Sequence, residues 1–137
     1  MLTITIIISI LLVITSLKLF ANNTQNKDSL VKATLSLCKS QDTSIRGIPT
    51  DWYENAIRLA RHESGNYKSK LARKYNNIFG MRHPAKRRTT STKSNEYGYA
   101  TYASLEDAVI DFHYWYCVNP RKKGEAWADY LRRRKWN

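Results

Sequence analysis

The segment between Pro49 and Gly65 carries the helical pattern that most constrains how this chain can fold. Its apolar residues recur at intervals of three and four, as in a helix that buries one face: Trp52, Ala56, Leu59 and Ala60. Glycine commonly follows the last turn of a helix, so we expect this helix to end at Gly65. Glu63 lies four residues after Leu59, and therefore on the buried stripe rather than on the solvent face.

This position predicts an unusual environment for the Glu63 carboxylate. Apolar neighbours and the negative end of the helix dipole both disfavour its charged form, so we expect its pKa to be raised. A carboxylic acid that keeps its proton near neutral pH can protonate the leaving oxygen of a glycosidic bond. A structural explanation stays open, in which Glu63 caps the helix or pairs with Arg61 or Lys68.

Two stretches around this helix end carry a longer pattern. They read HESGNYKSKLARKYNNIFGM from His62 and YATYASLEDAVIDFHYWY from Tyr99. The pattern is an acid followed by Ser-Gly, a short helix, an Asn-Asn-hydrophobic-Phe-Gly turn, and a Tyr-x-Ser-x-x-acid start to the next helix. In this order the parts resemble the glucosaminidase family of bacterial wall hydrolases, glycoside hydrolase family 73, over roughly Asp51 to Tyr116.

The resemblance implies a fold and an activity. The fold is α+β and mostly α: a lysozyme-like helical body with a small β-hairpin lobe over the cleft. The activity is cleavage of the β-1,4 bond after N-acetylglucosamine in peptidoglycan, without a cofactor. Carried over residue by residue, the general acid falls on Glu63, and the aromatic residue at the far wall of the cleft falls on Tyr102. The Asn-Asn-Ile-Phe-Gly turn supplies the substrate-binding candidates Asn76, Asn77 and Phe79.

A second catalytic carboxylate is harder to place. Many relatives carry it in a Thr-x-Glu segment well ahead of the aromatic motif, whereas here Glu96 is the only acid between Ser64 and Leu105. Glu96 is either the base that activates water or a residue of a hairpin turn. A wide separation from Glu63 would leave room for a water molecule and give inversion. Some relatives instead rely on the acetamido group of the substrate or on the tyrosine.

The remaining pattern predicts the scaffold. Further helices are expected at residues 28–40, 69–75 and 104–116, and after Gly124. In the first of these, the inward face is expected to hold Leu30, Thr34, Leu37 and Cys38. Helix starts are predicted from Ser69, from Ser104 with Asp107, and from Asp51 with Glu54, the last two pairs having capping-box spacing.

Residues 81–102 lack helical periodicity. Pro84, Gly98 and a run of Thr and Ser favour a loop or β-hairpin in this region. We expect Tyr97, Tyr99 and Tyr102 to share one face of the hairpin, and one or more of them to reach the cleft as substrate-binding residues.

The N-terminus differs sharply from the rest of the chain. Leu2 to Leu17 contains no charged residue and is rich in Ile and Leu. The run is shorter than the roughly 20 residues of a spanning helix and longer than the roughly 7 to 15 of a signal-peptide core. We expect either a signal peptide cut near Ala21 or a membrane anchor formed by residues 2–17, and hence an exported, periplasmic or extracellular protein.

Three parts of the chain follow from these patterns. Residues 1–21 form the export segment, residues 22–48 a linker and N-terminal helix, and residues 49–137 the glucosaminidase-like catalytic domain.

The chain is strongly basic, with a formal net charge of +12 in 137 residues. All but one of its 23 Lys and Arg residues lie beyond the export segment, so the mature part attracts polyanions. Because an exported protein meets the cell envelope, peptidoglycan strands and anionic envelope polymers are the expected partners, and nucleic acid takes second place.

The sequence gives little support for other chemistries. His62, His83 and His113 are too scattered to suggest a metal centre, and no nucleophile motif is present. Cys38 and Cys117 form either one disulfide or two free thiols.

We therefore predict an exported peptidoglycan hydrolase with Glu63 as general acid. Two alternatives stay open. One is cleavage of the lytic transglycosylase type, and the other is a non-catalytic basic module that binds the wall or nucleic acid.

Overall fold

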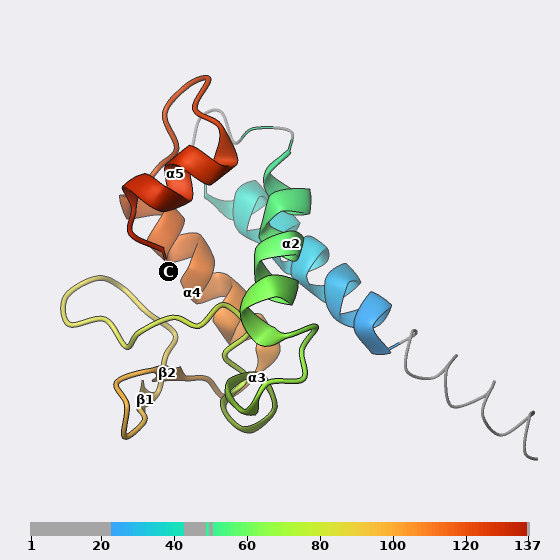
Figure 1. The fold of residues 1–137 in the computed structure, drawn as a ribbon, viewed down its shortest axis with the longest axis vertical. Coiled ribbons are helices and arrows are strands. Elements are labelled where there is room, and N and C mark those ends of the chain that lie inside the picture. The colour runs from blue at the N-terminus through green and yellow to red at the C-terminus, as the bar shows by residue number, and fades with distance from the viewer. Residues whose placement is uncertain (1–22, 43–48, 50, 137) are drawn as a thin grey trace, which may run out of the picture.

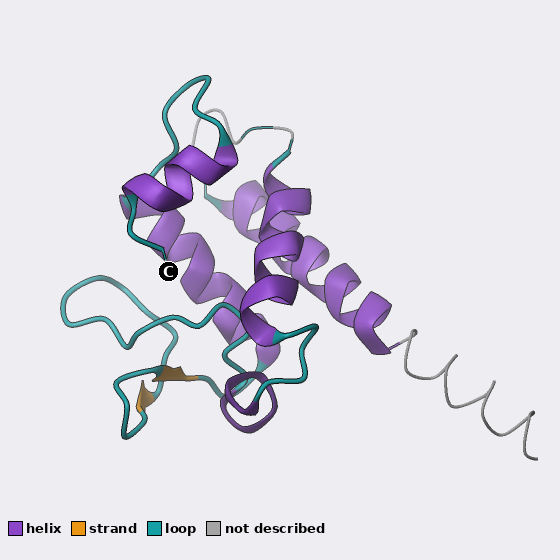
Figure 2. Ribbon diagram, viewed as in Figure 1, coloured by secondary structure: helices purple, strands orange, loops and turns teal. Residues whose placement is uncertain are grey.

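The structure, a computed structural model, describes residues 23–42, 49 and 51–136. The predicted export segment and its cleavage near Ala21 lie outside the described residues. The described part holds an N-terminal helix at residues 23–41 and six further elements (Figures 1 and 2): α2 (Trp52–Ser64), α3 (Lys70–Tyr75), β1 (Lys93–Ser94), β2 (Ala100–Thr101), α4 (Leu105–Val118) and α5 (Trp127–Arg133). The protein is thus mostly helical with one small antiparallel sheet, as the sequence predicted.

Aromatic rings from several elements form the core. Phe112 of α4 stacks on Trp52 of α2, with ring centroids 5.3 Å apart, and on Phe79 of the loop after α3, at 4.1 Å. Tyr116 and Trp127 complete the cluster around Trp52. Burying such large apolar rings supplies much of the stability of a small domain, so this cluster fixes α2, α4 and α5 against one another.

The predicted helix ends are largely confirmed. Gly65 ends α2 in the left-handed conformation at φ +56°. The Ser69 and Ser104 hydroxyls accept the N–H groups of Ala72 and Asp107, as N-caps do. The capping box at Asp51 is wrong, because its carboxylate caps no N–H of α2.

Asp51 instead pairs with a residue far along the chain. Its carboxylate accepts two hydrogen bonds from the Arg121 guanidinium, at 2.6 and 3.1 Å. A bidentate pair of this kind holds the loop before α5 against the start of α2.

The N-terminal helix packs against α2 along a face that overlaps only in part with the expected one, since Leu30, Thr34 and Cys38 are half-buried. It buries Val31 and Leu35, whereas Leu37 is 61% exposed, so the prediction of an inward Leu37 is wrong. Asp28 accepts hydrogen bonds from Arg61 and from the Tyr67 hydroxyl, which ties this helix to the end of α2.

A hairpin closes one side of the molecule, as predicted for this region. Strands β1 and β2 pair antiparallel, with Lys93 opposite Thr101 and Ser94 opposite Ala100. The Asn95 side chain accepts the backbone N–H groups of Tyr97 and Tyr99, and Gly98 has a positive φ. The turn is therefore stabilised by these local interactions as well as by the pairing of the two short strands. Among the described helices, none is both long and apolar enough to span a bilayer.

Candidate active site

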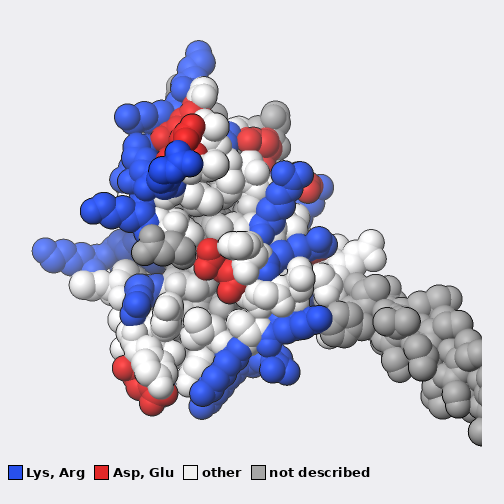
Figure 3. All heavy atoms as spheres, viewed as in Figure 1, with Lys and Arg blue, Asp and Glu red and all other residues white. Residues whose placement is uncertain are grey.

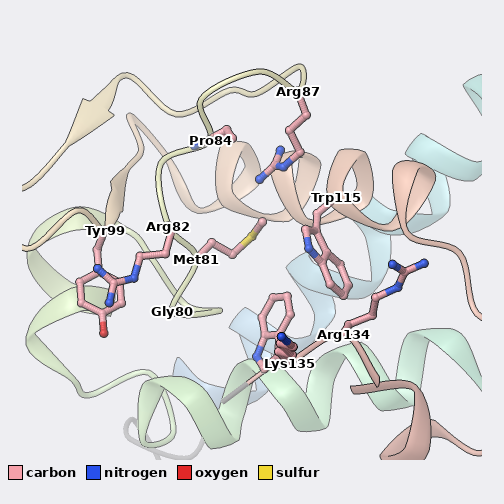
Figure 4. Close-up of a pocket in the computed structure, with 10 residues that line it drawn as sticks. Gly80, Met81, Arg82, Pro84, Arg87, Tyr99, Trp115, Arg134 and Lys135 are labelled. Carbon is pink, nitrogen blue, oxygen red and sulfur yellow. The ribbon is translucent and has the colours of Figure 1, made fainter. Parts of the chain in front are cut away.

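A cavity of about 460 Å³ opens between the loop after α3, the hairpin, α4 and the C-terminal segment (Figure 4). This volume suits a sugar-sized ligand. Its walls are basic and aromatic: Gly80, Met81, Arg82, Pro84, Arg87, Tyr99, Trp115, Arg134, Lys135 and Trp136.

Glu63 lies at the edge of this cavity, in the last turn of α2. Its Oε2 atom is 3.2 Å from the point where a β-carbon on Gly80 would lie. The indole N–H of Trp136 donates a hydrogen bond to the same carboxylate. Because Gly80 and Trp136 both line the cavity, the half-buried Glu63 carboxyl lies next to its wall, although Glu63 is not itself a lining residue.

The surroundings of Glu63 raise the pKa of its carboxyl above the ordinary value. Burial is the largest cause, since it disfavours the charged form. The charge of His62 and the hydrogen bond from Trp136 act in the opposite direction and only partly offset burial. The direction is the one that the sequence predicts, and it favours a carboxyl group that keeps its proton.

Ser64 and Gly65 explain why the acid is followed by Ser-Gly. The buried Ser64 hydroxyl donates to the Ala60 carbonyl and accepts the Tyr67 N–H at 2.7 Å, which closes the end of α2. Gly65 then reverses the chain with a positive φ. Together they fix the turn of helix from which Glu63 projects.

The Asn-Asn-Ile-Phe-Gly turn positions the cavity wall from inside the protein. Asn76 takes the left-handed conformation that ends α3, and its amide donates to the Tyr102 carbonyl at 3.0 Å. The buried Asn77 amide donates to the carbonyls of Met81 and Ala100 and accepts the Met81 N–H. These bonds fasten the loop that carries Gly80 to the hairpin.

Phe79 lies wholly in the core, where it stacks on Phe112. The residues predicted to bind substrate at positions 76, 77 and 79 therefore do not line the cavity, and Gly80 is the part of the turn that does.

Tyr102 is buried and belongs to a polar network beneath the cavity. Its hydroxyl donates to Asp111 Oδ2 at 2.7 Å, and Arg87 donates to both oxygens of the same carboxylate, at 2.6 and 3.0 Å. Burial and the neighbouring Asp111 charge raise the pKa of Tyr102 far above its ordinary value. Tyr102 thus stays protonated and holds Asp111, and only Arg87 of this network lines the cavity.

The hairpin residues separate from one another. Tyr99 lines the cavity, and the Arg82 guanidinium lies over its ring, 4.3 Å from the centroid (Figure 4). Tyr97 is 67% exposed, whereas Tyr102 is buried, so the three tyrosines do not share one face as predicted. Glu96 is exposed in the turn.

A smaller pocket of about 210 Å³ lies on the other side of Tyr99. Glu96 and Tyr97 line this pocket, together with Lys70, Leu71, Tyr75 and Asn95. Tyr99 is the residue common to both pockets. Glu96 is therefore brought near the same tyrosine as the main cavity, but not into the cavity that Glu63 borders.

Three features of the cavity were not predicted from the sequence. Trp115 and Trp136 form an aromatic corner, with ring centroids 4.6 Å apart and planes at 74°. Arg134 and Lys135 form part of the wall. No acidic side chain is among the described residues that line the cavity, and Figure 3 shows Lys and Arg around much of one face of the molecule.

A solved structure shares the fold of this chain. It is described as the structure of a type VI secretion system effector-immunity complex from Pseudomonas protegens. The likeness has a TM-score of 0.57 and 24% sequence identity, and it covers 81% of this chain and 77% of that one. Comparison with curated proteins finds no significant match.

A match to a family model shows the family to which the chain belongs. The glucosaminidase model, described as mannosyl-glycoprotein endo-beta-N-acetylglucosaminidase, matches residues 52–136, which is more than half of the chain. The matched segment contains the end of α2, the turn at Gly80, the hairpin and the C-terminal wall of the cavity. The chain therefore belongs to the glucosaminidase family of glycoside hydrolases.

Proposed function

We propose that this protein hydrolyses peptidoglycan at the β-1,4 bond after N-acetylglucosamine, with Glu63 as the general acid. The observation that carries the proposal is a half-buried carboxyl with a raised pKa at the wall of a sugar-sized cavity. Such a group holds its proton until the glycosidic oxygen needs it. Family membership supports the class of reaction.

The walls of the cavity suit a glycan strand. The Trp115 and Trp136 rings line the cavity and offer apolar surfaces for the faces of sugar rings. Arg82, Arg134 and Lys135 offer cations to the carboxylates that peptidoglycan carries on its stem peptides. A neutral polysaccharide would make no use of these charges.

The second catalytic role falls, in this proposal, to the acetamido group of the substrate. Its carbonyl oxygen attacks the anomeric carbon as the leaving oxygen takes the Glu63 proton. Water then attacks the same carbon, gives a proton to the Glu63 carboxylate and restores the acetamido group, with net retention. Glu96, exposed in the hairpin turn and outside the cavity, is a turn residue in this mechanism.

Clearing of bacterial sacculi tests the assignment of Glu63 as the general acid. Bacterial sacculi are incubated with the wild-type chain, with Glu63→Gln, and with Glu106→Gln, a control that neutralises an exposed acid at the start of α4. We expect the wild type and the control to clear the sacculi and Glu63→Gln to lose about a hundredfold or more of the rate. Equal clearing by Glu63→Gln would refute the assignment.

Product analysis and Glu96→Gln test the rest of the proposal. Mass spectrometry of the released sugars should show reducing N-acetylglucosamine ends, whereas anhydro-muramic ends would identify a transglycosylase. Glu96→Gln should keep most of the activity, and a loss as large as that of Glu63→Gln would make Glu96 the second catalytic carboxylate. Sedimentation with sacculi without released fragments would favour a binding module.

We also propose that residues 1–21 direct this protein out of the cytoplasm, because an uncharged apolar run precedes a basic, polar chain. Cell fractionation with and without these residues tests it. Retention of both forms in the cytoplasm would contradict it.

A further inference from the structure

A second group of chemically active side chains lies away from the cavity, where the end of the N-terminal helix meets α4. One donor atom from each of Asp42, His113 and Cys117 lies within 4.8 Å of the other two. These residues come from segments more than 70 positions apart in the sequence, so only the fold brings them together. None of them lines the cavity beside Glu63.

The buried His113 side chain has few polar contacts. It is 2% exposed, and neither ring nitrogen has a hydrogen-bond partner among the described residues. Asp42 Oδ2 lies 3.4 Å from Nε2, which is close enough for an ion pair but outside hydrogen-bond geometry. A buried polar atom left without a hydrogen bond is unfavourable by about 1–3 kcal/mol, so a buried imidazole whose Nε2 faces a carboxylate at 3.4 Å and whose Nδ1 has no hydrogen bond within the described residues requires an explanation.

The sequence spacing places two donors on each of the two helical segments. Cys38 precedes Asp42 by four residues, and the Asp42 N–H bonds to the Cys38 carbonyl at 2.9 Å, as in a helical turn. His113 precedes Cys117 by four residues within α4. Residues four positions apart lie on the same face of a helix, so the two side chains of each pair project from the same side. Both cysteines are free thiols and half-buried.

We propose that Asp42, His113 and Cys117 bind a zinc ion as its three protein ligands. Imidazole, thiolate and carboxylate are the ligands that zinc takes in tetrahedral sites, whereas magnesium and calcium prefer oxygen alone. The ion joins the end of the N-terminal helix to α4. The site is structural, because it links two helices, and it is independent of the proposed hydrolase activity.

The metal also accounts for the Cys117 thiol. The thiol donates a hydrogen bond to Asp42 Oδ2, with 3.6 Å between the two atoms. A zinc ion between the two groups would displace the thiol proton and replace this hydrogen bond by two metal bonds.

Metal titration of the full-length chain tests the site. After removal of metal with a chelator under reducing conditions, the chain is titrated with Zn²⁺ by calorimetry and with Co²⁺ by absorption spectroscopy. We expect one zinc ion per chain, a higher Tm with zinc, and a sulfur-to-cobalt charge-transfer band, which reports thiolate ligation. The absence of stoichiometric binding would overturn the proposal.

Variants separate this site from adventitious binding. Asp42→Asn and Cys117→Ser should each weaken zinc binding by more than about tenfold, the loss seen when even an outer-shell partner is removed. His83→Gln, which changes an exposed histidine of the hairpin lobe, should leave it unchanged. Unchanged binding in Cys117→Ser would overturn the proposal, and the Tm of each metal-free variant shows whether it still folds.

Cys38→Ser distinguishes the metal from a disulfide. This variant cannot form a Cys38–Cys117 bond but keeps the three residues of the site, so zinc should still raise its Tm. A disulfide in the wild-type chain isolated without reductant, or loss of the zinc effect in Cys38→Ser, would refute the three-residue site.

Discussion

Glu63 Oε2 lies 3.2 Å from the point that a β-carbon on Gly80 would occupy, and Gly80 has φ +65°. Glycine is therefore favoured at this position for two separate reasons. Only glycine takes a left-handed backbone without strain, and only the lack of a side chain leaves the carboxyl its place at the cavity wall. The two residues lie in separate parts of the family motif, and the fold brings them into contact.

Gly80→Ala should impair activity beyond its effect on stability. A left-handed alanine costs about 1–2 kcal/mol, and the added methyl group pushes the Glu63 carboxyl aside. Because a displacement of about 1 Å can lower a rate about a hundredfold, we expect clearing of sacculi to fall about tenfold or more. Gly124→Ala is the matched control, since Gly124 has φ +75° and nothing within 4 Å of its added β-carbon. Equal activity losses in the two variants would mean that backbone strain alone explains the effect.

Glu63→Gln should gain stability at neutral pH while it loses activity. Since the fold raises the pKa of Glu63, its contribution to stability is fully present below the ordinary carboxyl pKa and is lost as the pH rises through the folded-state value. At pH 7 the unfolded chain gains more free energy from ionising this carboxyl than the folded protein does, and glutamine removes that difference. Thermal unfolding should show a higher Tm for the variant at pH 7 and no gain near pH 4. A lower Tm at pH 7 would contradict the raised pKa.

Trp136→Phe should shift the pH dependence of activity toward alkaline pH. The indole N–H stabilises the charged carboxylate, so its loss raises the pKa of Glu63 further and keeps the acid protonated to higher pH. The measurement is the rate of sacculus clearing as a function of pH. Trp115→Phe alters an indole of the same cavity without removing this hydrogen bond, and its alkaline limb should not move.

Tyr102→Phe should reduce stability more than turnover. The variant removes one hydrogen bond to the Asp111 carboxylate, worth about 1.5–3 kcal/mol for a charged group, and leaves the Arg87 pair in place. Arg87→Met leaves Asp111 buried and unpaired and should cost more, about 3–5 kcal/mol. Urea unfolding measures both. A hundredfold fall in rate with unchanged stability in Tyr102→Phe would instead make Tyr102 a catalytic residue.

Local pattern was enough to predict the helices and the direction in which the pKa of Glu63 is shifted. The α2 stripe, the Ser69 and Ser104 caps and the hairpin all follow from spacing and turn chemistry over a few residues. Where a distant partner competes, the prediction fails. Asp51 has the spacing of a cap, but a bidentate bond to Arg121 outweighs a single helix N–H.

Tertiary contacts decided the features that spacing did not reveal. Trp136 follows a short basic helix without periodicity, and nothing nearby in sequence indicates that it reaches Glu63. The scattered histidines suggested no metal centre, since the approach of His113 to Asp42 depends on two helices packing together. Phe79 and Asn77 sit in a motif that resembles a binding turn, yet burial in the core makes them supports of the cavity wall.

The wall contributed by the C-terminal segment exposes the enzyme to a simple form of inactivation. Arg132, Arg133 and Lys135 are exposed on the segment that leads to Trp136. A protease that cuts after basic residues would sever Trp136 from α5 and spare the stacked rings of Trp52, Phe79 and Phe112. The cut protein would lose both the indole surface and the proton donor to the Glu63 carboxylate.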